Sequence, residues 1–313
     1  MEILAEGGDF PVKKILILLL AAALILPVAA GGETAEFSYK KGTYPADAEY
    51  IDLGNNTVTK EDMDAFITFL HQFSRLKQVD MFATKIPGNR IARLKEEFPE
   101  IEFGMSMIVG IEHIVRTDAT AFSTLHGVDN QYEHTAEDFA LLKYCRNLYA
   151  LDIGHNLVDD LSFLKDLPKL RVLIVAKNRL TDITPIAELK DLEYLEVFGN
   201  NVTDLSPLQD LPHLTDLNVT GNRIEDLSPL QNITSLRRLW VNNCNKYAEL
   251  DRAAVEALRQ ALPEAEIDDV NPGTGGTWRT GEHYKTIQRM FKNSVYEPFD
   301  DVSFPEYAWE RSE

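Results

Sequence analysis

The side chains that could do chemistry in this chain are seven histidines, two cysteines and a recurring set of serines and aspartates. The histidines show neither the HExxH nor the HxH spacing, and no Cys–His spacing suits zinc. No serine stands in a GxSxG turn, and the GTGG stretch at 273–276 is not followed by the lysine of a phosphate-binding loop. The sequence therefore predicts no catalytic residue, no cofactor and no metal ion, in a protein that is not an enzyme.

The aspartates recur because a turn recurs. They stand beside successive copies of one turn, and their side chains are suited to bonding with the nearby backbone. A row of carboxylates is also compatible with calcium, but local bonding is the interpretation that we favour. The recurring residues are Asp160, Asp182, Asp204 and Asp226, with Ser162, Ser206 and Ser228.

A period of 22 residues decides the fold. Five segments with the pattern LxxLxLxxN start at leucines spaced by 22, and each predicts one short strand whose apolar residues enter a shared core. The asparagine position suits a side chain that bonds backbone amides of adjacent turns. The leucines are Leu148, Leu170, Leu192, Leu214 and Leu236, and the asparagine positions hold Asn156, Asn178, Asn200, Asn222 and Cys244.

Each asparagine is followed by a second theme, seen as LTDITPI, VTDLSPL and IEDLSPL. Together the two themes resemble the internalin-type leucine-rich repeats of Gram-positive bacteria over residues 136–245. Looser similarity of EEFPEIEFGM and RTDATAFST links the chain to secreted leucine-rich proteins of Firmicutes. The resemblance implies an α/β solenoid, a leucine-rich-repeat horseshoe with a parallel concave β-sheet, and protein binding through that face.

Longer, degraded turns precede the regular ones. Strands are expected in 48–58, 76–86 and 119–127 and near Ile101–Met107, with a helix in 61–73 and a last helix and strand in 253–267. A helix in 277–299 is expected to cover the last coil, because an open solenoid end needs a cap. The predicted organisation is a linker at 31–47, longer turns with an N-terminal cap at 48–135, regular turns and last repeat at 136–270, a C-terminal cap at 271–300 and a tail at 301–313.

Residues 1–30 are predicted to form a secretory signal peptide. Two lysines precede a short apolar run that ends in small residues, and the run is shorter than the roughly 20 residues of a spanning helix. A single membrane anchor is the alternative. The acidic residues before the lysines suit a signal peptide badly, so translation from Val12 is a further hypothesis. The predicted location is secreted or extracellular, with retention at the cell surface left open and membrane contact only during export.

The net charge argues against nucleic-acid binding, and the spacing of the two cysteines argues against a disulfide. The formal net charge is 31 − 50 = −19, which repels nucleic acid, and the chain shows no basic patch. Cys145 and Cys244 lie 4.5 turns apart, roughly 20 Å at the usual strand spacing of about 4.8 Å. A disulfide needs Cα atoms within about 7 Å, so two buried free thiols are expected.

The predicted binding surface consists of strand residues that alternate with the inward leucines. Several are large and apolar where a purely structural repeat would carry small polar residues, as at an interface hot spot. The alternative is that the C-terminal cap or the tail folds back over this face. We expect a protein partner on a host or neighbouring cell, or alternatively a glycan or peptide bound by an envelope-associated or structural module. The predicted contact residues are Val172, Ile174, Tyr194, Glu196, Phe198, Asp216, Asn218, Arg238 and Trp240.

Overall fold

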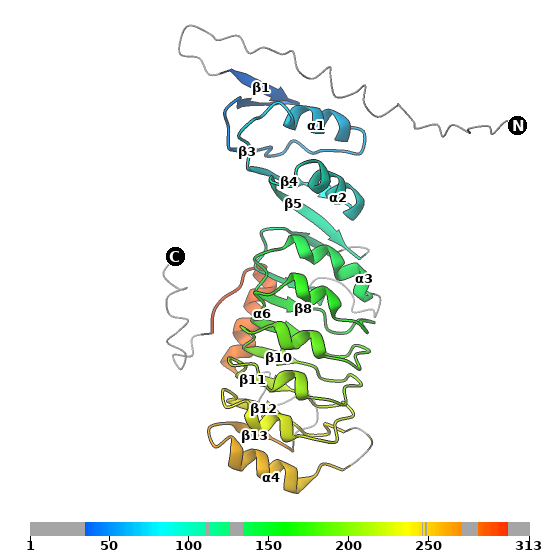
Figure 1. The fold of residues 1–313 in the computed structure, drawn as a ribbon, viewed down its shortest axis with the longest axis vertical. Helices are drawn as coiled ribbons and strands as arrows, with labels where there is room; N and C mark the ends of the chain where they lie inside the picture. Colours follow the sequence, from blue (N-terminus) through cyan, green and yellow to red (C-terminus); the bar gives the residue numbers. More distant parts are fainter. Residues whose placement is uncertain are drawn as a thin grey trace, which may run out of the picture.

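The computed structural model describes residues 35–110, 113–125, 134–245, 247, 249–270 and 281–299. The predicted signal peptide, the hypothetical start at Val12, the GTGG stretch and the tail at 301–313 lie outside the described residues. Successive turns of chain stack along one axis, with the strands on one side and helices α1 to α4 on the other (Figure 1). We call the sheet face opposite α1 to α4 the concave face.

The described part of the chain begins with a β-hairpin, in the range that was predicted to be a linker. Strands β1 (Glu36–Tyr39) and β2 (Gly42–Pro45) pair antiparallel. Their tyrosines explain the difference, because Tyr39 and Tyr44 are both buried. The Tyr39 ring lies 5.1 Å from that of Phe69 in helix α1 (Met63–Leu70). The hairpin thus covers the first end of the core.

A four-stranded sheet follows. Strands β3 (Tyr50–Asp52), β4 (Gln78–Ile86) and β5 (Glu102–Val109) are parallel, as the predicted longer turns require, and β6 (His113–Arg116) returns antiparallel to β5. Helix α2 (Gly88–Glu97) covers the convex side through buried Ile91 and Leu94. Neither α2 nor β6 was predicted from the sequence.

The regular turns form a seven-stranded parallel sheet separate from the first. Matching residues of neighbouring turns stand side by side: Leu173 pairs with Leu151 and with Leu195. The convex side carries α3 (Ala136–Phe139), α4 (Arg252–Ala261) and one short 3-10 helix per turn. The strands are β7 (Ala121–Ser123), β8 (Ala150–Asp152), β9 (Val172–Ile174), β10 (Tyr194–Glu196), β11 (Asp216–Asn218), β12 (Arg238–Trp240) and β13 (Glu266–Asp268). The 3-10 helices are η1 (Ala140–Tyr144), η2 (Ser162–Asp166), η3 (Thr184–Glu188), η4 (Ser206–Leu208) and η5 (Ser228–Asn232).

The repeated asparagines join one turn to the next. Nδ2 of Asn200 donates to the carbonyl oxygens of Val175 and Val197, both at 2.9 Å, and Oδ1 accepts from the amide of Leu180 at 3.0 Å. Asn178 and Asn222 make equivalent bonds. In the fifth copy the amide of Ile224 donates instead to the carbonyl oxygen of Cys244, so the backbone replaces the missing side chain.

The aspartates and cysteines have structural roles. Asp204 Oδ1 accepts from the amide of Ser206 at 2.8 Å and its Oδ2 from the hydroxyl, and the other three aspartates accept the corresponding amide bond. Local bonding therefore accounts for the recurring carboxylates. Both cysteines are buried free thiols, as predicted. Among the described helices, none has the length and apolar character needed to cross a membrane.

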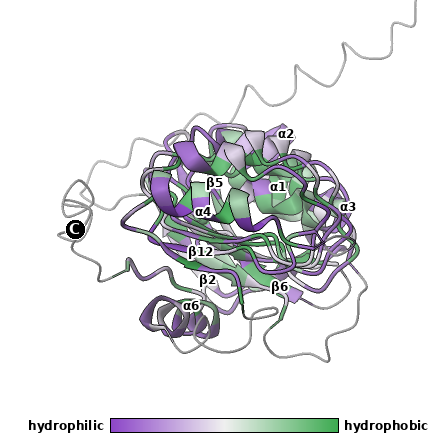
Figure 2. Cartoon of the chain, turned by 90° about the horizontal axis from the view of Figure 1, so that it is seen from below, coloured by the Kyte–Doolittle hydropathy of each residue, from purple (hydrophilic) through white to green (hydrophobic). Residues whose placement is uncertain are grey.

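Helix α6 (Glu282–Asn293) departs from the predicted cap. It was expected to cover the last coil, but it lies on the other side of the strands from α1, α3 and α4 (Figure 2). Its C-terminal part packs beside β7 and β8, at the opposite end of the regular sheet from β13. The concave face supplies the reason, because its apolar residues offer α6 a surface to pack on.

Candidate binding surfaces on the concave face

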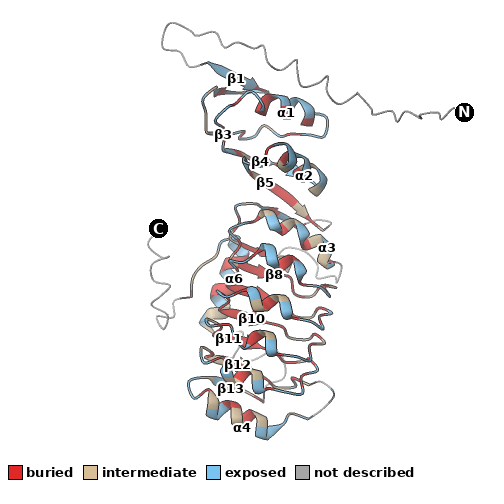
Figure 3. Ribbon diagram, in the orientation of Figure 1, coloured by how far each residue is buried: buried red, intermediate tan, exposed pale blue. Residues whose placement is uncertain are grey.

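The concave face of the regular turns is covered, which corrects the expectation that the predicted contact residues face solvent. The strands β8 to β12 lie in the buried part of the molecule (Figure 3). The apolar side chains of α6, Ile287, Met290 and Phe291, pack there together with Phe299. Seven predicted residues are buried and two are partly buried, so the alternative of self-coverage describes this structure. The buried ones are Val172, Ile174, Tyr194, Glu196, Asp216, Asn218 and Trp240, and the partly buried ones are Phe198 and Arg238.

Residues 281–299 form helix α6 and a following segment that turns back toward the start of the helix. Near the start of α6, Nδ1 of His283 lies 3.0 Å from Oδ2 of Asp216 in β11. Near its end, the amide of Tyr296 donates to the hydroxyl of Thr120 at 2.7 Å, just before β7. Ser294 adopts φ 56, the left-handed conformation that often ends a helix. The chain then comes back to Phe299, whose ring stacks on His283 at 4.2 Å. We call residues 281–299 the C-terminal insert.

The floor beneath the insert is polar as well as apolar. The Tyr194 hydroxyl donates to the Glu196 carboxylate, and Arg238 pairs with the fully buried Asp216. Burial, with the negative charge of Glu196 second, raises the pKa of Tyr194 well above its ordinary value. Asn218 is fully buried; its Oδ1 accepts from the Thr220 amide, while its Nδ2 has no hydrogen-bond partner among the described residues.

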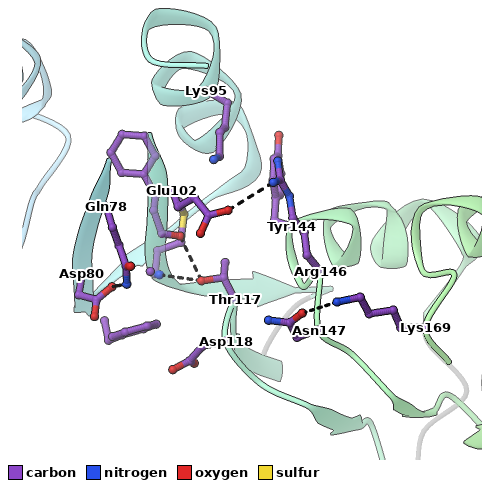
Figure 4. Close-up of a pocket in the computed structure, with 14 residues that line it drawn as sticks. Gln78, Asp80, Lys95, Glu102, Thr117, Asp118, Tyr144, Arg146, Asn147 and Lys169 are labelled. Carbon is purple, nitrogen blue, oxygen red and sulfur yellow. Dashed lines mark hydrogen bonds and ion pairs between the residues drawn. The ribbon is translucent and has the colours of Figure 1, made fainter. Parts of the chain in front are cut away.

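The concave face of the four-stranded sheet is open. The strand register aligns Tyr50 with Gln78 and Glu102, and Asp52 with Asp80 and Gly104, on one side. A cleft of about 440 Å³ lies against β4 and β5 and extends to the first regular turn (Figure 4). Tyr50, at the margin of this face, keeps 51% of its surface exposed. The degraded repeat pattern of this part gave no sequence signal for a surface site.

The cleft brings together charges of both signs. Lys95 comes from α2 and Arg146 and Lys169 from the regular turns, while Asp80, Glu102 and Asp118 come from the four-stranded sheet and the segment after it (Figure 4). Arg146 lies 3.4 Å from Glu102, and Lys169 donates to Asn147 at 2.9 Å.

Lys95 is held at the wall of the cleft. Its ammonium donates to the carbonyl oxygen of Ile101 at 2.8 Å and lies 5.4 Å from the centre of the Phe103 ring. Burial, followed by the positive charge of Arg146, lowers the pKa of Lys95. The arrangement suits recognition of a partner with charged groups of both signs. In the described part of the chain no three histidine, cysteine or carboxylate side chains are grouped to hold a metal ion.

The repeats match a known family model. Residues 168–210, 190–232 and 212–254 each match the model described as leucine-rich repeats in two copies. The fold is a leucine-rich-repeat solenoid. Leucine-rich-repeat folds typically serve as non-enzymatic scaffolds that bind proteins. No curated protein matches the sequence of this leucine-rich-repeat chain.

Solved leucine-rich-repeat structures align with parts of this chain. An internalin from Listeria monocytogenes is 24% identical with TM-score 0.34, over 51% of this chain and 53% of its own, so the match spans about half of that internalin. Internalin C2 of the same species is 23% identical with TM-score 0.34, over 60% of this chain and 78% of its own. A leucine-rich-repeat protein of Leptospira interrogans is 16% identical with TM-score 0.34, over 64% and 74%.

Proposed function

We propose that this solenoid is a non-enzymatic protein-binding module, and that its partner contacts the open cleft between the four-stranded sheet and the first regular turn. The observation that carries the proposal is the uncovered, charged concave surface around Asp80, Glu102, Lys95 and Arg146, next to a regular sheet that is already covered. Charge arranged in this way favours specificity and association rate.

The proposal extends to location and partner. The apolar run that precedes Gly31, together with the resemblance to internalin-type repeats, supports export to the cell surface or the medium. A partner on a host or neighbouring cell is consistent with that location. The expected partner is a protein whose surface supplies acidic groups to Lys95 and Arg146 and basic groups to Asp80 and Asp118.

A glycan- or peptide-binding role in the envelope is the second candidate. The volume of about 440 Å³ is within the range of small-ligand sites. Phe82 and Tyr144 supply aromatic surface in the lining, and Gln78 and Asn147 supply amides that suit hydroxyl groups. This candidate uses the same cleft, so the same variants test it.

The test is to screen the purified protein against arrays of extracellular proteins and of glycans, and then to measure each hit with variants. Arg146→Glu reverses a charge in the cleft, and Lys165→Glu makes the same positive-to-negative change at an exposed position on the convex side. We expect Arg146→Glu to weaken binding at least 10-fold and Lys165→Glu to leave it unchanged. A bound ligand that tolerates Arg146→Glu and Asp80→Lys alike would overturn the assignment of the cleft, and a glycan hit with no protein hit would favour the second candidate.

A further inference from the structure

The covered half of the concave face points to a second interaction. We propose that the groove over β7 to β12 accepts an amphipathic helix of another protein, and that the C-terminal insert is an intramolecular occupant which leaves when that helix binds. The inference rests on the proposed protein-binding function, but it concerns a different surface from the cleft, so either can fail without the other.

The hydrophobic core of the solenoid does not include the C-terminal insert. The main apolar cluster runs from the N-terminal hairpin to α4, and no residue of the insert belongs to it. Ile287, Met290, Phe291 and Phe299 belong to a separate cluster, which lies between the insert and the concave face. Since adjacent turns of a solenoid stabilise one another, loss of the insert exposes one surface and leaves the core in place.

The groove has the shape of a helix site. Its floor under the C-terminal half of α6 is made of small side chains, Ala121 and Ala150, which let a helix approach the sheet closely. Larger side chains continue the apolar surface toward the other end, among them Tyr194 and Trp240. A helix of 12 residues is marginal on its own in water, so α6 owes its order to this surface.

The polar floor holds more hydrogen-bonding capacity than α6 uses. His283 lies within hydrogen-bonding distance of the carboxylate of Asp216, but the amide Nδ2 of Asn218 has no partner among the described residues. A buried donor without a partner destabilises the covered state, whereas an occupant with a carbonyl, carboxylate or amide oxygen at that point would bond it. Natural cores rarely leave such a group, and a groove that exchanges occupants gives a reason for it.

The pattern of α6 defines the partner. The occupant needs apolar residues at the positions of Ile287, Met290 and Phe291, which lie on one face of the helix. It also needs histidine or a cationic residue four positions before the first of these, where His283 meets Asp216. Where it passes β11, it also needs a hydrogen-bond acceptor for Nδ2 of Asn218. An amphipathic helix of about three turns satisfies all three conditions.

The experiment uses the full chain and a labelled peptide of residues 281–299. Ile287→Asp with Phe291→Asp places two charges against the apolar groove and should release the insert, while Gln288→Asp changes an exposed position of the same helix. We expect the double variant to bind the peptide at least 100-fold more tightly than the wild type or Gln288→Asp. A second peptide that keeps His283, Ile287, Met290 and Phe291 but replaces the outer face should bind equally well.

Three results would overturn the proposal. One is a folded double variant that does not bind the peptide. Another is exchange of labelled chains between wild-type molecules, with dimers in light scattering, because the occupant would then be a second copy. If the double variant does not fold, hydrogen exchange of the wild type decides: amides of α6 should exchange at least 100-fold faster than those of β10, and equal rates would contradict release. Arg146→Glu should leave peptide binding unchanged, which separates this result from the cleft.

Discussion

Replacement of Asn200 by alanine tests how the turns are joined. Asn200 is fully buried, and its amide bonds the carbonyl oxygens of Val175 and Val197 and the amide of Leu180. The substitution leaves the buried Leu180 N–H without this acceptor, while the carbonyl oxygens of Val175 and Val197 keep the bonds donated by Asn178 and Asn222. An unsatisfied buried group costs about 1–3 kcal/mol and each of the two lost hydrogen bonds about 0.5–1.5 kcal/mol, so the free energy of unfolding should fall by about 2–6 kcal/mol.

The assay is urea unfolding followed by circular dichroism, with the slope of the transition compared between variants. The matched control is Asn232→Ala, since Asn232 is exposed at the end of η5 and should change stability by less than about 0.5 kcal/mol. Asn200→Asp keeps an acceptor for Leu180 but sets a buried carboxylate oxygen against the carbonyl oxygens of Val175 and Val197, so it should destabilise the protein at least as much as Asn200→Ala. A loss below about 0.5 kcal/mol for Asn200→Ala would refute the view that the asparagines hold successive turns together.

Three further predictions concern the core and its titrating groups. Cys145 and Cys244 should resist a water-soluble thiol reagent at pH 8 in the folded protein, because burial raises the pKa of both thiols, that of Cys145 to about 12; rapid modification of either would contradict this. Burial raises the pKa of Tyr39 to about 12 from an ordinary value of 10.0, so its contribution to stability is present below pH 10 and is lost as the pH rises toward 12. Tyr39→Phe should therefore reduce the alkaline loss of stability, and an unchanged pH profile would count against the assignment. Leu195→Ala, in the centre of the core, should lower the free energy of unfolding by about 2–5 kcal/mol in urea titration, and a change below about 1 kcal/mol would be inconsistent with its complete burial.

The regular turns were predictable because the 22-residue period determines several structural features at once. The 22-residue spacing aligns Leu173 with Leu151 and Leu195, and so it gives the strand, its register and the inward side together. The longer turns lack that redundancy. Their strands were predictable from the degraded repeat pattern, but α2 and β6 were not. Neither was the hairpin, whose Tyr39 and Tyr44 pack against Phe69 in the helix that follows.

The candidate site was predictable only in part, for a physical reason. Alternation places Tyr194 and Trp240 on the concave side, and the structure has them there. Their burial depends on the C-terminal insert, which lies about 40 to 105 residues further along the chain. A sequence shows that apolar side chains leave the strand on the side opposite the core, but not which segment covers them. The cleft was missed because its residues come from three separate segments, 78–118, 144–147 and 169.

Large apolar side chains on the outward side of a repeat indicate that something packs on them, either a segment of the same chain or another molecule. In this chain the covering segment is α6, so solvent exposure cannot be the property that marks the concave face as a binding surface. What distinguishes it from an ordinary interior is the polar floor, where Asp216, which His283 of α6 contacts, and Asn218 of the same strand are fully buried. Apolar residues of similar size would hold α6 with less desolvation, because burying a carboxylate or an amide costs free energy unless each group is fully bonded. Retention of such groups under a helix that bonds them incompletely is the feature that a permanent cap does not explain and that an exchangeable occupant does.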